Sequence, residues 1–203
     1  PVEELARGGL CVVTLALARS GRGFERLVAL KELTGAGAGD SDLAEELRTE
    51  GQLAARLRHP HVVSVLDVGE GQRGPFLVLE YVEGGGLYDL AWMASRRGLG
   101  LDVGLAVRLV MDALEGLAHA HGHSGEHGPE PVIHRDVSLR NVLVGNDGVA
   151  KIGDFGLARA KSRVGNTHPH TVKGTLGYMS PEQMRGEPLS VSTDVYGMGA
   201  VLW

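Results

Sequence analysis

The spacing of apolar residues changes along this chain from a period of two to a helical period, and the change follows the run Gly84-Gly85-Gly86. Before these glycines, Val12 to Ala18 and Leu27 to Leu33 are aliphatic runs on either side of a glycine-containing turn, as in paired strands. After them, Leu87 to Arg97 and Val103 to about His121 have apolar residues at helical spacing. The order predicts a strand-rich lobe and then a mostly helical lobe, with the glycine run as the hinge between them.

One helix is expected to interrupt the strands of the first lobe. Asp42 with Glu45 three residues later fits a capping box at its start, and His59-Pro60 should end it. Two further runs, Val62 to Val68 and Phe76 to Val82, are predicted to pair as strands. The first lobe is therefore expected to be a sheet with a single helix.

Composition limits the classes to which the chain can belong. The 43% hydrophobic and 22% charged residues are typical of a globular protein, and the one cysteine, Cys11, favours a reducing compartment. A net charge of −5 argues against a broadly basic nucleic-acid-binding face. No apolar run reaches the roughly 20 residues that span a bilayer. We expect a cytoplasmic protein, or the cytoplasmic domain of a membrane-anchored parent, with no nucleic-acid partner and no membrane segment within this chain.

The sequence stops inside an apolar run that begins near Val195 and ends at Trp203. A domain rarely ends in the middle of such a run, because its apolar side chains would remain in water. We therefore expect the sequence to be a fragment whose larger lobe is incomplete.

Two charged residues stand where burial is expected. Lys31 shares the apolar face of a predicted strand with Leu27, Ala29 and Leu33. Glu50 interrupts the apolar stripe of the following helix, a stripe formed by Leu43, Leu47, Ala54 and Leu57. Either side chain alone could extend its charged end to solvent. Because a buried charge is tolerated when it is paired, Lys31 and Glu50 are predicted to form an ion pair.

A second group of residues is suited to metal and proton chemistry. Asp136 and Asn141 lie five residues apart just before a predicted strand, and Asp154 begins the sequence Asp-Phe-Gly beyond the next turn. A few side-chain oxygens are what Mg²⁺ accepts when phosphates supply its other ligands. A carboxylate that holds no metal, such as Asp136, can orient a nucleophilic hydroxyl.

Together these motifs resemble, in their order along the chain, the catalytic domain of eukaryotic-like serine/threonine protein kinases of the bacterial type. The residues that carry the resemblance are Val28-Ala29-Leu30-Lys31, Glu50, His134-Arg135-Asp136 with Asn141, Asp154-Phe155-Gly156, Ser180-Pro181-Glu182 and Asp194. The resemblance implies an α+β, two-lobed fold with a small antiparallel-sheet N-lobe and a mostly helical C-lobe. We place these lobes at residues 1–83 and 84–203.

The resemblance also implies an activity, which is transfer of the γ-phosphoryl group of ATP to serine or threonine hydroxyls of protein substrates, with Mg²⁺. In the family, residues matching Asp136 act as base, those matching Asn141 and Asp154 bind the metal, and Lys31 with Glu50 matches the phosphate clamp. Ser138 stands where these kinases usually place a lysine near the γ-phosphate. The residues expected to contact the nucleotide are Gly8, Val13, Ala29, Lys31, Leu79, Glu80 and Val82.

Two departures from the family keep an alternative open. The three glycines of the phosphate-covering loop align with Ala6, Gly8 and Cys11, so only Gly8 is kept, and Ser138 brings no positive charge. A pseudokinase, or a nucleotide-binding scaffold with little turnover, is therefore the second hypothesis. A small-molecule phosphotransferase ranks last, because it would not be expected to carry the Ser-Pro-Glu motif and a threonine-bearing activation segment.

The segment from His134 to Asn141 resembles the catalytic loop of the family. Four histidines precede it, namely His119, His121, His123 and His127. No cysteine or carboxylate constellation accompanies them, and the stretch is rich in glycine. We interpret it as a helix end followed by an inserted loop rather than as a metal site.

The segment between Gly156 and Ser180, which matches the activation segment of the family, suggests a phosphorylation switch. Thr175 matches the threonine of the substrate-facing loop, so Thr171 is the better phosphate acceptor and Thr167 the second choice. A phosphate at Thr171 adds a charge of about −1.5 to −2, and charge-assisted hydrogen bonds to Arg135 would order the segment. We expect Thr171 to be phosphorylated by self-associated copies of the chain, and Thr171→Ala to lower activity. Phosphosite mapping after incubation with ATP and Mg²⁺, with Thr167→Ala as comparison, tests this. An unmodified Thr171 and a fully active alanine variant would exclude the switch.

Overall fold

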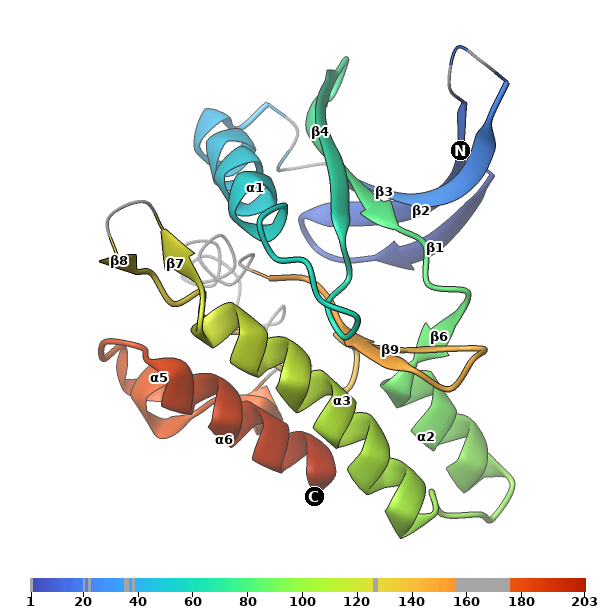
Figure 1. Cartoon of the computed structure of the whole chain (residues 1–203), viewed down its shortest axis with the longest axis vertical. Helices are drawn as coiled ribbons and strands as arrows, with labels where there is room; N and C mark the ends of the chain where they lie inside the picture. Colours follow the sequence, from blue (N-terminus) through green and yellow to red (C-terminus); the bar gives the residue numbers. More distant parts are fainter. Residues whose placement is uncertain are drawn as a thin grey trace. The chain divides into compact units, whose positions relative to one another are not determined.

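The computed structural model describes residues 2–19, 21, 23–34, 37, 39–125, 128–155 and 176–203. The chain divides into two compact units, of which the first is Pro1–Arg56 with Ser64–Tyr81 and the second is Leu57–Val63 with Val82–Trp203. The first unit is an antiparallel sheet with one helix, and the second is mostly helical, as Figure 1 shows. The predicted fold class is confirmed.

Five strands form the sheet of the first unit. They are β1 (Glu3–Arg7), β2 (Cys11–Arg19), β3 (Glu25–Leu33), β4 (Val65–Gly71) and β5 (Gly74–Glu80), in the order β1-β2-β3-β5-β4 with antiparallel neighbours. The predicted runs 12–18 and 27–33 lie inside β2 and β3. The strand expected to begin at Val62 begins only at Val65, because Val62 and Val63 instead pair with Ile152 in the second unit.

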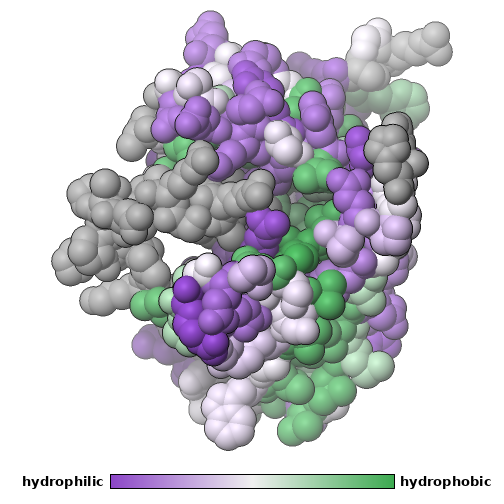
Figure 2. Space-filling model, turned by 90° about the vertical axis from the view of Figure 1, so that its left-hand side faces the viewer, coloured by the Kyte–Doolittle hydropathy of each residue, from purple (hydrophilic) through white to green (hydrophobic). Residues whose placement is uncertain are grey.

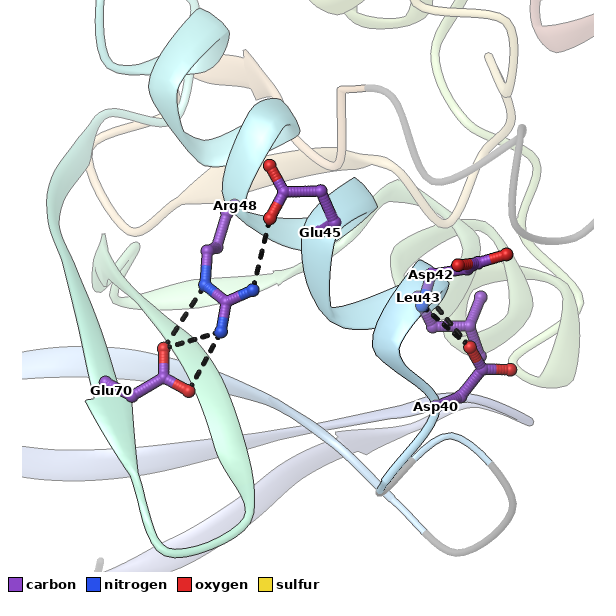
Figure 3. Close-up of polar contacts among 6 residues, drawn as sticks. All are labelled: Asp40, Asp42, Leu43, Glu45, Arg48 and Glu70. Atoms are coloured by element: carbon purple, nitrogen blue, oxygen red, sulfur yellow. Dashed lines mark hydrogen bonds and ion pairs between the residues drawn. The ribbon is translucent and has the colours of Figure 1, made fainter.

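The predicted capping box of Asp42 and Glu45 is wrong, because helix α1 (Ser41–Ala54) has a different N-cap. Asp40 is the N-cap, and its carboxylate accepts hydrogen bonds from the Asp42 N–H at 2.9 Å and the Leu43 N–H at 3.2 Å (Figure 3). A cap of this kind satisfies N–H groups that have no partner within the helix.

Glu45 takes part in an ion network instead of a cap. Arg48 of α1 donates from Nη1 to Glu45 at 3.2 Å. It also donates to the Glu70 carboxylate of β4, from Nη2 at 3.0 Å and from Nε at 3.3 Å (Figure 3). The network joins α1 to β4 on the outside of the first unit, where such pairs contribute little stability individually.

The apolar face of α1 packs on the sheet as the sequence stripe predicts. Leu43, Leu47 and Ala54 are buried, and α1 contacts β4 and β5. A Cβ at Gly51 would overlap the end of the Leu77 side chain of β5, so glycine allows this close approach without a shift of Leu77.

The second unit contains the helices α2 (Leu87–Arg96), α3 (Val103–His121), α5 (Pro181–Arg185) and α6 (Val191–Leu202), and the 3₁₀ turn η2 (Leu176–Tyr178). Its short strands are β6 (Gly84–Gly86), β7 (Ser124–Gly125), β8 (Gly128–Pro129), β9 (Val142–Gly145) and β10 (Ala150–Ile152). Helices α2 and α3 match the predicted segments to within one residue. Among the described residues, no helix combines the length and apolar character needed to cross a membrane.

The glycine run expected as the hinge between the lobes forms the strand β6, which pairs with β9 in the order β10-β9-β6. A Cβ at Gly84 would overlap the main chain at Val144. Glycine is therefore required here for close approach of two backbones rather than for freedom of rotation.

Helix α3 is the centre of the second unit and lies alongside α6 (Figure 1). Its residues Leu109, Ala113, Leu117 and Ala120, the stripe predicted from spacing, are almost fully buried. Helix α6 buries Met198 but exposes Val195 and Leu202. Figure 2 shows apolar surface gathered on this unit.

A pair of glycine substitutions tests the packing of α3. A Cβ at Gly116 would overlap the His61 carbonyl and lie 3.0 Å from Ile152 Cγ2. A Cβ at Gly199 of α6 would meet no described atom within 4 Å apart from the neighbouring backbone of its own helix. We expect Gly116→Ala to lower the free energy of unfolding by about 1–3 kcal/mol. The matched variant Gly199→Ala should raise it by roughly 0.5–1 kcal/mol, because alanine favours a helix. Urea denaturation measures both, and equal stabilisation by the two alanines would contradict the packing.

Candidate active site

The predicted ion pair between β3 and α1 is present in the first unit. Lys31 Nζ lies 3.3 Å from Glu50 Oε1, and the two side chains are only 2% and 8% exposed. Charges so well buried need a partner, because the protein interior solvates them poorly. The pair therefore fixes the lysine on the sheet.

The strand register places the residues expected around a nucleotide on one face of this sheet. Val13 lies opposite Lys31 across β2 and β3, and Ala29 lies opposite Leu79 across β3 and β5. Residues two apart on a strand share a face, and so do direct cross-strand partners. Ala29 is buried, and Val13 and Leu79 are half-buried. Three apolar side chains and the paired lysine thus form one surface.

The connection between β1 and β2 contains the one retained glycine of the expected phosphate loop. The Gly8 N–H donates to the Cys11 carbonyl at 2.8 Å, and Gly8 is exposed. Cys11 is 8% exposed. Its burial is consistent with a small residue that fills a packed position at the start of β2.

Glu80 and Val82 are the remaining residues expected at the nucleotide. The Glu80 N–H donates to the Ser64 carbonyl at 2.9 Å, and the Glu80 carboxylate accepts from the Ser64 N–H at 3.2 Å. Val82 is half-buried and belongs to the second unit.

In the second unit, Asp194 at the start of α6 holds the catalytic loop. Its carboxylate accepts hydrogen bonds from the backbone N–H groups of His134 and Arg135, both at 2.8 Å. Asp194 is 1% exposed, and Arg135 has a φ of 68°, a left-handed conformation that is uncommon for a residue with a side chain. The two hydrogen bonds stabilise this backbone conformation.

His134 and Asn141 join the catalytic loop to the segment that carries Asp154. The His134 Nε2 atom lies 2.7 Å from the Gly153 carbonyl, and the His134 ring contacts Phe155 with centroids 4.6 Å apart. The Gly153 N–H donates to the Asn141 carbonyl at 2.8 Å. The residue before Asp154 is therefore fixed on both of its main-chain groups.

The structure brings the candidate base and the candidate metal ligands onto these connected segments. Asp136 is 5% exposed, and its carbonyl accepts from the Asn141 side-chain amide at 2.6 Å. Ser138 is 7% exposed, and its carbonyl accepts from the Asn141 N–H at 3.1 Å. Asp154 is exposed and has a φ of 62°.

The donor set fits Mg²⁺ better than a metal held by protein alone. Within the described ranges, no group of three or more histidines, cysteines, aspartates or glutamates could hold a metal ion. Asn141 and Asp154 offer one amide and one carboxylate. Mg²⁺ accepts such a small set when phosphate oxygens and water complete its octahedron.

Two of the clustered histidines, His119 and His121, contact other side chains of the second unit. His121 Nε2 lies 2.7 Å from the Asp194 carboxylate. His119 stacks on His59 with ring centroids 5.0 Å apart, and burial together with the neighbouring His119 and His61 lowers the pKa of His59. His127 and the activation-segment residues Thr171 and Thr175 lie outside the described residues.

Sequence reasoning missed two contributors to this site. Gln183 donates directly to the Arg135 carbonyl, and His121 contacts Asp194, whose carboxylate holds the Arg135 N–H. Their partners lie 73 and 48 residues away along the chain, so no local pattern indicates them.

Comparison with known proteins places this geometry in context. The family model of the protein kinase domain matches residues 2–203. The chain is 34% identical over 203 residues to the tyrosine-protein kinase MasK of Myxococcus xanthus, covering 100% of this chain and 31% of MasK. It is 37% identical over 211 residues to the serine/threonine-protein kinase PknB of Mycolicibacterium smegmatis, covering 99% and 31%. It is 34% identical over 180 residues to the serine/threonine-protein kinase PrkC of Bacillus subtilis, covering 89% and 26%. The chain thus spans less than a third of the length of these relatives.

Substitution of Asp194 tests how far the loop depends on it. Asp194→Asn keeps one acceptor oxygen and points an amide N–H₂ group at a backbone donor, so one buried N–H loses its partner. We expect the free energy of unfolding to fall by about 1–3 kcal/mol. Asp67→Asn makes the same chemical change at an exposed position of β4 and should alter stability by less than about 0.5 kcal/mol. Indistinguishable urea midpoints for the two variants would refute this dependence.

Proposed function

Because the chain belongs to the protein kinase family, we propose that it transfers the γ-phosphoryl group of ATP to serine and threonine hydroxyls of proteins. The observation that carries the proposal is the linkage of Asp136, Asn141 and Asp154 through the hydrogen bonds of Gly153 and His134. A base and two oxygen ligands on one rigid framework suit phosphoryl transfer, in which positioning and charge stabilisation dominate.

Asp136 is proposed as the group that orients the substrate hydroxyl and accepts its proton. Its backbone is held on one side by the Asn141 amide and follows Arg135, which Asp194 fixes. Asn141 and Asp154 would hold Mg²⁺, which when bound neutralises negative charge on the phosphates. Protein kinases as a family use ATP and Mg²⁺.

Lys31 is proposed to bind the α- and β-phosphates. Its ion pair with Glu50 limits the positions that the ammonium group can take, so less conformational entropy is lost when a phosphate arrives. Val13, Ala29 and Leu79 would offer apolar surface to the adenine ring. The main-chain groups of Gly8, Glu80 and Val82 are proposed to form hydrogen bonds with the nucleotide.

Two features support a lower-activity alternative, a pseudokinase or nucleotide-binding scaffold. The β1–β2 connection has only Gly8 from the expected glycine set, and Ser138 can donate a hydrogen bond but carries no charge. Neither feature removes the base or the metal ligands, so the active kinase is the better hypothesis.

The acceptor residue is a further part of the proposal. MasK is named a tyrosine kinase, whereas PknB and PrkC are named serine/threonine kinases. Gly174-Thr175 and Tyr178-Met179 resemble the substrate-facing loop of serine/threonine kinases, and this resemblance supports hydroxyls of serine and threonine. The lobe division at residues 83 and 84, autophosphorylation between copies and a cytoplasmic location remain predictions on the grounds given above.

Loss of the lysine or of the metal-binding carboxylate tests the activity. We expect Lys31→Met and Asp154→Asn each to lower phosphoryl transfer at least about a hundredfold, which corresponds to roughly 2.7 kcal/mol of barrier. The matched controls Lys151→Met and Asp67→Asn should retain activity within about threefold, because neither residue is assigned a role. The measurement is transfer from radiolabelled ATP to a generic protein and to an aminoglycoside, followed by phosphoamino-acid analysis.

The outcomes separate the hypotheses. Phosphoserine and phosphothreonine that depend on Lys31 and Asp154 support the proposal, and phosphotyrosine alone would change the acceptor. A labelled aminoglycoside would indicate a small-molecule phosphotransferase. Nucleotide binding without transfer would indicate a scaffold.

A further inference from the structure

The backbone of Arg135 is held on its carbonyl side as well as on its N–H side. Its N–H donates to Asp194 at 2.8 Å, and its carbonyl accepts from Gln183 Nε2 at 2.7 Å. Arg135 has a φ of 68° and directly precedes Asp136. A residue in this sparsely populated region persists only where its surroundings hold it there. The carbonyl hydrogen bond therefore restrains, together with the N–H hydrogen bond, the residue that directly precedes Asp136.

The amide of Gln183 is held in one orientation. Its oxygen Oε1 accepts from the Ser180 N–H at 3.0 Å, as the N3 residue of the capping box of α5. Because the oxygen is used in the cap, the nitrogen Nε2 faces Arg135. The helix that carries Gln183 is itself joined to α6, since the Thr193 hydroxyl donates to the Glu182 carboxylate at 2.8 Å.

Gln183 also lies beside the candidate base in space. A small recess of the second unit is lined by residues that include Asp136, Tyr178 and Gln183. Residues 178–183 and residues 135–137 therefore line the same recess, and Gln183 joins the two segments by a hydrogen bond.

We propose that Gln183 is a positioning residue for Asp136, which holds the Arg135 carbonyl and so fixes the catalytic loop to the first turn of α5. This proposal rests on the proposed kinase function for its kinetic consequence only. A capping residue without this role needs the acceptor oxygen alone, whereas a positioning residue also needs the N–H donor. The two roles can therefore be separated by removing the donor and keeping the acceptor.

Gln183→Glu makes that separation. The carboxylate retains an acceptor for the Ser180 N–H, but it cannot donate to the Arg135 carbonyl and repels it. We expect kcat to fall at least about tenfold, with KM for ATP within about twofold. Amide hydrogen exchange of residues 134–137 should become faster, while the melting temperature stays close to that of the wild-type chain.

Two further variants control for charge. Met184→Glu adds the same charge at the next position of α5, where the side chain is 62% exposed, and should leave kcat and exchange unchanged. Gln183→Met lacks both the donor and the cap acceptor without adding charge, and it should act in the same direction as Gln183→Glu. If both Gln183 variants match Met184→Glu in kcat and in exchange, the positioning role is overturned. A wild-type chain without turnover would instead contradict the proposed function, and the exchange comparison would still decide the role of Gln183.

Discussion

The buried carboxylate of Asp194 is the constraint on which the second unit most depends. It accepts from two consecutive backbone N–H groups, at His134 and Arg135, and contacts His121 of α3. One side chain thus joins α6, α3 and the catalytic loop. A buried carboxylate is costly unless such donors surround it, so the loop and the helices stabilise one another. The candidate base is placed by this arrangement although Asp194 has no assigned chemical role.

The first unit also contains buried charge that is stabilised by a partner. Lys31 and Glu50 are charged, buried and in contact, and they come from a strand and a helix 19 residues apart. Replacing both by apolar residues of similar volume could cost little stability, because burial of an ion pair is seldom favourable on balance. The role proposed for Lys31 at the phosphates gives a reason for the pair, since a fixed ammonium group would be ready to bind them. The exposed Arg48 network adds a second attachment of α1 to the sheet.

The sequence allowed prediction wherever a feature depends on local periodicity. Strands β2 and β3, helices α2 and α3 and the Lys31–Glu50 pair all follow from apolar spacing, since a charge in an apolar row is visible without a structure. The start of α1 was misplaced because both Asp40 and Asp42 are good caps and only the backbone geometry chooses between them. The strand Gly84–Gly86 was missed because glycine normally indicates a turn, and its close contact with β9 is a tertiary property.

The least predictable feature is the backbone conformation at the site. Arg135 and Asp154 both have positive φ values, of 68° and 62°, yet neither residue type indicates this in a sequence. Such a conformation costs of order 1–3 kcal/mol at each residue. Arg135 and Asp136 are supported from different directions, by Asp194 and Gln183 at Arg135 and by the Asn141 amide at Asp136. Because these supports come from three separate segments, the loop takes this conformation only when α5, α6 and the segment before β9 have packed together. The geometry for chemistry is in this sense a product of the tertiary fold, and local sequence supplies only the groups that it arranges.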